Sequence, residues 1–201
     1  MKMVVVGGHA RNIGKTSVMV GLIRGLPALD WTAVKITQYG HGICSHDGEP
    51  CECAPTEHPF VVIQEQDAGG RGDTCRFLAA GARRAFWLRA RQDQLGEALP
   101  ALEQALGTDE HIIIESNSIL GFVRPTVYLA VLDSSVRDFK ASALRYLDLA
   151  DALVPVGSGF RRSAWPGLNP ELMADKPVFP VKSRTYASLG LCRFVGNKLG
   201  L

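Results

Sequence analysis

The segment from residue 3 to residue 24 places a short glycine-containing loop between an apolar run and a helical pattern. Residues 3 to 8 form the apolar run, Gly14-Lys15-Thr16 ends the loop, and the helical pattern starts at Ser17. The backbone N–H groups of such a loop, with the N-terminus of the following helix, make a concave positive site for a polyphosphate. This order predicts a phosphate-binding loop in which Lys15 contacts the β- and γ-phosphates and the Thr16 hydroxyl holds Mg²⁺.

The loop is a variant of the usual pattern G-x-x-x-x-G-K-[ST]. That pattern places a glycine at position 9, where this chain has His9, and Gly8 stands one residue early. An ordinary helix start is the alternative interpretation, because Thr16 and Ser17 suit the first turn of many helices. Strand, glycines, lysine, hydroxyl and helix nevertheless fall in the required order, so we expect nucleotide contacts from the following residues: Gly8, Arg11, Asn12, Ile13, Gly14, Lys15, Thr16 and Ser17. Arg11 is either a solvated side chain or an arginine that stabilises developing charge.

Composition narrows the class of protein. The chain has 201 residues, of which 46% are hydrophobic and 21% charged, and this predicts a globular domain spanning residues 1–201. The formal charge of +2 gives no excess that would favour nucleic acid or an anionic membrane as a partner. No apolar stretch reaches the ~18 residues of a membrane-spanning helix, and the first apolar run is too short for a signal peptide. We therefore expect a cytoplasmic protein.

Apolar, β-rich runs alternate with helical segments along the chain. We expect strands at residues 3–7, 31–36, 60–63, 85–88, 111–115, 127–132, 152–156 and 178–181. We expect helices at residues 16–26, 73–81, 95–106, 139–151 and 183–198. Several of the strand runs are continuously apolar, as in strands covered on both faces. The alternation predicts a three-layer, doubly wound α/β fold with a mostly parallel sheet.

Ligands of doubly wound sheets bind beyond the carboxyl ends of the strands. Glu115 ends an apolar strand, where its carboxylate can hold Mg²⁺ or orient an attacking water, although solvated acids at strand ends are common. Lys35, near the end of the second expected strand, can bind a phosphate or substrate oxygen or be an exposed edge lysine. Asp73 suits either a helix N-cap or the Mg²⁺ shell. Asp67 lies in a glycine-rich segment of the kind that responds to a γ-phosphate.

Residues 38–59 form a Gly-, Pro-, Cys- and His-rich insertion with no periodicity. Cys44, Cys51 and Cys53 are candidate Zn²⁺ ligands, with three histidines at positions 41, 46 and 58. Their spacing, C-x₆-C-x-C, matches no standard zinc motif, so separate reduced thiols remain the alternative. Cys75 and Cys192 lie in apolar helical patterns and are expected in the core.

These motifs together resemble the molybdopterin-guanine dinucleotide biosynthesis protein B family of P-loop NTPases. The similarity covers about residues 1 to 156: the phosphate-binding loop, a second strand with Lys35, a helix from Asp73 to Ala-Gly-Ala at positions 80–82, and a strand ending in Glu115. The family has glycine after that glutamate, where this chain has Ser116. The resemblance implies a GTP-binding, dimeric accessory protein of molybdenum-cofactor maturation, with molybdopterin or a cofactor-maturation protein as partner.

Together these features favour a slow, Mg²⁺-dependent GTPase or ATPase in which Lys15, Glu115 and Asp73 are catalytic and Thr16, Glu115 and Asp73 surround the metal. Two alternatives stay open. One is an ATP-dependent ligase or kinase that resembles dethiobiotin synthetase, which shares the strand-end Lys and Glu positions. The other is a metallochaperone in which the nucleotide opens the loop from Cys44 to Cys53.

Overall fold

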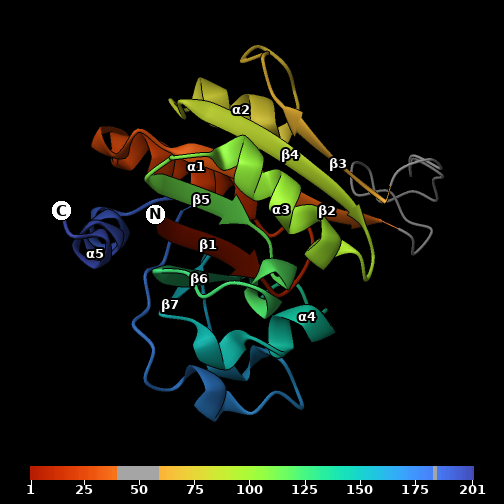
Figure 1. The fold of residues 1–201 in the computed structure, drawn as a ribbon. Coiled ribbons are helices and arrows are strands. Elements are labelled where there is room, and N and C mark those ends of the chain that lie inside the picture. The colour runs from red at the N-terminus through yellow and green to blue at the C-terminus, as the bar shows by residue number, and fades with distance from the viewer. Residues whose placement is uncertain (40–58, 183–184) are drawn as a thin grey trace.

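A computed structural model of the chain describes residues 1–39, 59–182 and 185–201. It contains a seven-stranded sheet with the order β3-β4-β2-β5-β1-β6-β7 (Figure 1). The strands are β1 (Lys2–Gly8), β2 (Thr32–Tyr39), β3 (Phe60–Gln64), β4 (Arg84–Arg91), β5 (His111–Glu115), β6 (Val127–Leu132) and β7 (Ala152–Pro155). The helices are α1 (Lys15–Gly25), α2 (Asp73–Ala79), α3 (Leu95–Leu106), α4 (Ala141–Leu144) and α5 (Leu189–Leu199). Short 3₁₀ turns occupy Pro27–Leu29, Ser118–Gly121, Leu147–Leu149, Arg162–Ala164 and Pro170–Met173.

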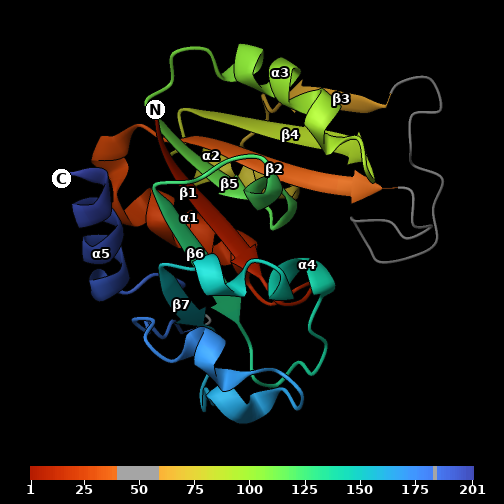
Figure 2. The ribbon, with the colours of Figure 1, turned by 60° about the horizontal axis from the view of Figure 1, so that its bottom comes forward.

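Two hydrophobic clusters, one on each face of the sheet, make the fold three-layered. On one face α1, α2 and α5 pack on the strands, with Val18, Phe77 and Leu191 fully buried. On the other face α3 and the 3₁₀ turns that follow β5, β6 and β7 cover the sheet through residues such as Leu95, Ile119 and Met173 (Figure 2). The central strands are buried on both faces, which explains their continuously apolar sequences. The expected three-layer α/β fold is confirmed.

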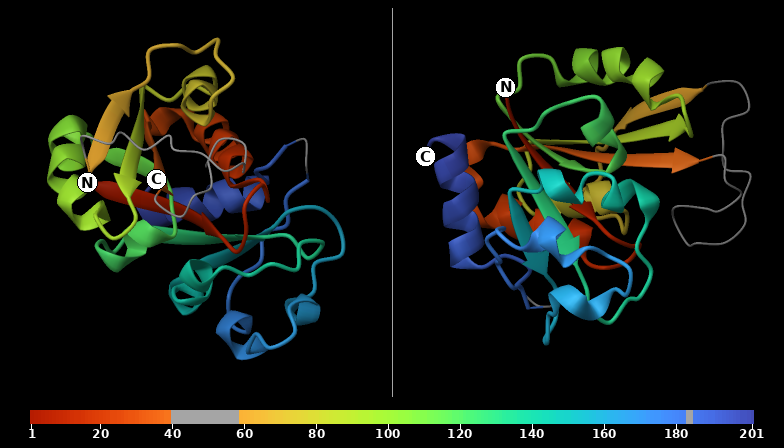
Figure 3. Two further views of the ribbon diagram at one scale, coloured as in Figure 1. Left: turned by 90° about the vertical axis from the view of Figure 1, so that its right-hand side faces the viewer. Right: turned by 90° about the horizontal axis from the view of Figure 1, so that it is seen from below.

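Helix α5 lies beside α1 and brings the C-terminus close to the first residues of β1 (Figure 3). The Lys2 ammonium donates a hydrogen bond to the Leu199 carbonyl oxygen and so links the two ends of the chain. No helix in the described part of the chain combines the length and apolarity needed to cross a bilayer.

Strand β3 pairs antiparallel with β4, so the sheet is mostly parallel, as expected, with one antiparallel edge. The structure corrects three expectations about the elements. Residues 139–151 form two short turns, α4 and Leu147–Leu149, in place of one helix. Helix α5 begins at Leu189, where Ser188 accepts a hydrogen bond from the Leu191 N–H as the N-cap, and not near residue 183. Residues 178–181 make only isolated parallel bridges to β7.

Candidate nucleotide-binding site

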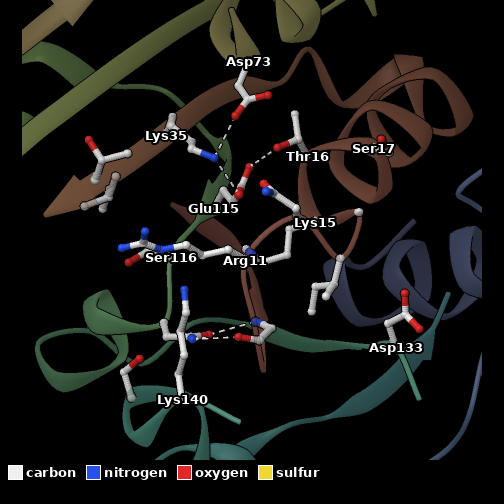
Figure 4. A pocket seen from close by; sticks show the side chains of 18 of the residues that line it. Arg11, Lys15, Thr16, Ser17, Lys35, Asp73, Glu115, Ser116, Asp133 and Lys140 are labelled. Carbon is white, nitrogen blue, oxygen red and sulfur yellow. Dashed lines mark hydrogen bonds and ion pairs between the residues drawn. The ribbon is translucent and has the colours of Figure 1, made fainter. Parts of the chain in front are cut away.

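A cavity of about 950 Å³ lies at the carboxyl edge of the parallel strands (Figure 4). The loop between β1 and α1, residues of β2 and α2, and residues that follow β5, β6 and β7 line it. The sequence-predicted residues that line it are Gly8, Arg11, Asn12, Ile13, Gly14, Lys15, Thr16, Ser17, Lys35, Asp73 and Glu115. Residues far apart in the chain are therefore brought together at one edge of the sheet, as the doubly wound topology requires.

The loop holds Lys15 folded back over its own backbone. The Lys15 ammonium donates a hydrogen bond to the Ala10 carbonyl oxygen over 2.8 Å. A Cβ atom on Gly8 would lie 2.9 Å from the Lys15 Cδ and 2.9 Å from the Ile13 Cδ1, so only glycine leaves room for the lysine stem. Gly8 thus leaves space for the Lys15 side chain, although it stands one residue before the glycine of the usual pattern. Burial lowers the pKa of Lys15, which favours an anionic partner for its ammonium.

Helix α1 begins immediately after Gly14, whose backbone is left-handed with φ of 93°. This conformation favours glycine, and a Cβ atom there would lie 3.0 Å from the Tyr186 ring. Asn12 is also left-handed, with φ of 56°, a conformation that asparagine tolerates. The Ile13 side chain is buried in the core. The buried Ile13 side chain thus holds the turn against the core, while the backbone of the turn borders the cavity.

Two carboxylates contact a lysine ammonium beside this loop, and a hydroxyl donates to one of them. Glu115 Oε2 accepts a hydrogen bond from the Thr16 hydroxyl over 2.7 Å, and Glu115 Oε1 lies 2.7 Å from the Lys35 Nζ. The same ammonium lies 2.8 Å from Asp73 Oδ2. Figure 4 shows the four side chains converging from α1, β2, α2 and β5. Glu115 is only 4% exposed, so its charge requires these partners.

The charges of this cluster reinforce one another. Burial opposes the charged form of Lys35, but Glu115 and Asp73 outweigh it and raise the lysine pKa. Burial likewise opposes ionisation of Asp73, but the Lys35 ammonium and then Arg76 hold the pKa of Asp73 below its usual value. The shifts of both pKa values favour the charged forms of Lys35 and Asp73 at neutral pH.

The oxygen donors of this cluster fit Mg²⁺, which prefers carboxylates, hydroxyls and water. Thr16, Asp73 and Glu115 are such donors, and the contacts of the two carboxylates with the Lys35 ammonium mark a place already organised around positive charge. The residues present therefore fit the metal that the sequence pattern implies.

The remaining sequence-predicted residues are divided between this site and other places. Ser17 borders the cavity, and its hydroxyl accepts a hydrogen bond from Arg76 Nη2 over 3.0 Å. Asp67 is exposed and does not line the cavity, because antiparallel β3 ends at the opposite edge of the sheet. Cys44, Cys51 and Cys53 lie outside the described residues. Cys75 and Cys192 are buried thiols, as expected.

Three contributors to the site have contacts that were not predicted from the sequence, although Asn117 was a candidate ligand donor or turn cap. Asn117 accepts from the Gly8 N–H and donates to the Gly8 carbonyl, each over 2.9 Å, and so fixes the start of the loop. His9 is fully buried beneath the loop, and Lys140 borders the cavity ahead of α4. The histidine at a glycine position was the only signal for this arrangement, and it does not reveal its partners.

Comparison with known proteins shows the fold and no closer relationship. No family profile matches the chain, and no curated protein matches it. Among solved structures, HypB from Helicobacter pylori in complex with nickel is 16% identical, with a TM-score of 0.52 over 98% of this chain and 86% of that one. LpxK from Aquifex aeolicus in complex with ATP is 18% identical, with a TM-score of 0.48 over 90% of this chain and 53% of that one.

Three observations define the fold class: the order of the strands, the loop between β1 and α1, and the similarity to HypB. The chain has the three-layer α/β fold of P-loop NTPases.

Proposed function

We propose that the chain binds a Mg²⁺ nucleoside triphosphate and hydrolyses it slowly. The observation that carries this proposal is one hydrogen-bonded cluster beside the Lys15 loop, in which Asp73 and Glu115 contact one ammonium and the Thr16 hydroxyl donates to Glu115. P-loop enzymes need a hydroxyl and a strand-end carboxylate in this relationship to the loop lysine. A solvated strand-end acid, the alternative for Glu115, does not agree with its 4% exposure.

The residues of the cavity divide the chemistry between them. Lys15 leaves the Ala10 carbonyl oxygen and binds the β- and γ-phosphates, while the loop backbone cradles them. Thr16, Asp73 and Glu115 would hold Mg²⁺, which supplies neutralisation of the charge that develops on the phosphates. With Mg²⁺ held by these oxygens, the Lys35 ammonium would be available to a phosphate oxygen.

Hydrolysis then needs a positioned water. Asp73, whose side chain is 34% exposed, is the more accessible of the two carboxylates and accepts a hydrogen bond from that water. The water oxygen forms a bond to the γ-phosphorus, the bond from that phosphorus to the β,γ-bridging oxygen breaks, and the water proton passes to the released phosphate. A lone carboxylate base agrees with slow turnover.

The molybdenum-cofactor role belongs to this proposal through the family resemblance. It adds GTP as the nucleotide, a homodimer as the assembly, and molybdopterin or a cofactor-maturation protein as partner. Nucleotide competition decides the first point: GTP, and not ATP, should displace a bound fluorescent analogue at lower concentration.

The experiment that tests the proposal measures phosphate release from GTP and ATP with and without Mg²⁺. We expect slow, Mg²⁺-dependent release by the wild type and a loss of at least about tenfold in Glu115→Gln. Release that is independent of Mg²⁺ and unchanged in Glu115→Gln would overturn it. Strong acceleration by a small carboxylic acid would instead support the ligase or kinase alternative.

One segment of the sequence supports the metallochaperone alternative. Three cysteines and three histidines fall at positions 41–58, directly after the strand that carries Lys35. The structurally similar HypB is described in complex with nickel. Elemental analysis of protein purified without added metal tests this alternative, because stoichiometric zinc or nickel supports it and a metal-free, fully active protein counts against it.

A further inference from the structure

Lys140 is a cation of the cavity that the hydrolytic site leaves unused. It precedes α4, and its side chain reaches toward Arg11 from the wall opposite Lys35 (Figure 4). Within residues 1–39, 59–182 and 185–201, its ammonium takes part in no hydrogen bond or ion pair. The Lys35 ammonium, by contrast, is paired with two carboxylates, and that of Lys15 donates to a carbonyl oxygen.

The surroundings of Lys140 are strongly cationic. Burial, then the charges of Lys15 and Arg11, lower its pKa to about 8, with a further contribution from Lys35. Asp138 acts in the opposite direction but does not restore the usual value. Gathering like charges in a half-buried place costs free energy, and an anion bound among them would recover it.

His9 fixes the backbone that carries Lys140. The Asp133 N–H donates to His9 Nε2 over 3.0 Å, and His9 Nδ1 lies 2.7 Å from the Asp138 carbonyl oxygen. Since a backbone N–H can only donate, Nε2 is the acceptor and Nδ1 carries the proton. The His9 carbonyl oxygen also accepts from the Lys140 N–H over 2.8 Å. Both ends of the segment from Asp133 to Lys140 are thereby fastened to the phosphate-binding loop.

Aromatic packing also stabilises the contact between His9 and the segment from Asp133 to Lys140. The His9 ring stacks on Phe139 at 5.2 Å between centroids and meets the edge of Trp165 at 4.8 Å. Trp165 in turn donates from Nε1 to the Val136 carbonyl oxygen over 2.9 Å. The residue that replaces the usual loop glycine is therefore the one that fixes the position of Lys140 beside the phosphate site.

We propose that Lys140, positioned by His9, binds a phosphoryl anion that lies beyond the β-phosphate of the nucleotide. This inference rests on the proposed function, because the anion is placed relative to a nucleotide on the Lys15 loop. The chemistry is shared by two sources: the terminal phosphoryl group of the triphosphate, and the phosphate of a separate substrate that binds beside a diphosphate. An unpaired ammonium whose backbone is held by His9, and whose charge interacts with those of Lys15 and Arg11, suits either one.

The test compares Lys140→Gln and Lys140→Arg with the wild type by titration calorimetry. The probes are a diphosphate, a non-hydrolysable triphosphate analogue, and inorganic phosphate added to the diphosphate complex. We expect Lys140→Gln to weaken the triphosphate analogue about 10- to 100-fold while the diphosphate changes less than about twofold. Lys140→Arg, which keeps the charge, should restore most of the loss.

The outcomes separate the two sources and the two proposals. A loss confined to inorganic phosphate in the diphosphate complex assigns the subsite to a second substrate. Equal affinities of wild type and Lys140→Gln for every probe overturn the inference while leaving the nucleotide site intact. A wild type that binds no nucleotide overturns the proposed function itself. Lys198→Gln, a lysine of α5 that pairs with Asp151 at 3.2 Å, is the control and should change no affinity.

The role of His9 as a positioning residue has its own readout. We expect His9→Ala to lose the same preference for the triphosphate analogue over the diphosphate, and Lys140→Gln to add little in that background. His9→Gln, which retains one donor and one acceptor, should rescue part of the preference. Equal weakening of both nucleotides by His9→Ala, with the full effect of Lys140→Gln still present, would show that His9 only stabilises the fold.

Discussion

Lys35 and Glu115 are direct neighbours across the parallel pairing of β2 and β5, and their side chains form an ion pair of 2.7 Å on the same face of the sheet. The register of two strands thus brings the lysine to the carboxylate that also accepts from Thr16. Because the carboxylate is almost wholly buried, the pair is a structural requirement as well as part of the candidate metal site.

Removal of Lys35 alone should destabilise the protein. Lys35→Met leaves the charges of Glu115 and Asp73 buried without their partner, and we expect a loss of about 3–5 kcal/mol in the free energy of unfolding. Urea denaturation measures this loss. Mg²⁺ should stabilise Lys35→Met more than it stabilises the wild type, because the metal no longer competes with an ammonium.

The double variant Lys35→Met/Glu115→Gln is the matched control. It removes both charges of the pair, so most of the lost stability should return. A double variant that is as unstable as Lys35→Met would show that packing of the lysine stem, and not charge, stabilises this place.

Gly8→Ala should impair phosphate binding more than folding. The added Cβ would meet the Lys15 and Ile13 side chains at 2.9 Å and displace the lysine stem from the loop. We expect triphosphate affinity to fall about tenfold or more, measured by calorimetry. Gly190→Ala in α5 is the control, because its Cβ would make an ordinary contact of 3.6 Å with Phe179 and alanine favours the helix. Unchanged affinity in Gly8→Ala would contradict the close packing described.

Ionised Glu65 should stabilise the turn that leads to Asp73, so the free energy of unfolding should fall at acid pH. The Thr74 hydroxyl, the Asp67 N–H and the Cys75 thiol lower the pKa of Glu65 from 4.5 to about 2. A lowered folded-state pKa stabilises the fold above the unfolded value, so this contribution is present above pH 4.5 and is lost as pH falls toward 2. The difference in unfolding free energy between wild type and Glu65→Gln should therefore shrink over that interval.

Glu97→Gln, on the exposed side of α3, serves as the comparison for Glu65→Gln. Its unfolding free energy should follow the wild type at every pH. A gap between wild type and Glu65→Gln that stays constant from neutral pH to pH 3 would mean that the carboxylate does not hold this turn.

The sequence predicted the central sheet and the loop well because both depend on local pattern. The continuously apolar runs of β5 and β6 have the bounds expected, and glycine, lysine and hydroxyl fall between β1 and α1. Inspection of polar residues at strand ends also predicted Lys35 and Glu115, because a parallel sheet gathers its strand ends at one edge. Asp73 follows antiparallel β3 and reaches the cavity as the first residue of α2.

The features that were missed depend on contacts between distant segments. An apolar run carries no information about pairing direction, so β3 could not be recognised as antiparallel. Residues 139–151 have a helical pattern, but only two short turns form. His9 of the loop contacts the start of this segment through the Asp138 carbonyl oxygen and the Phe139 ring. The partners of His9 lie more than 120 residues away, at sequence separations of 124 and 129, which no local pattern records.

Equilibrium binding of Mg²⁺ nucleotides to wild type and Lys15→Ala tests the central claim most directly, with Lys198→Ala as the matched lysine control. The account predicts that Lys15→Ala binds GTP and ATP at least about tenfold more weakly than the wild type, because a charge-assisted phosphate contact is lost, and that Lys198→Ala binds as the wild type does. Equal affinities of wild type and Lys15→Ala would contradict the assignment of this loop as the triphosphate site.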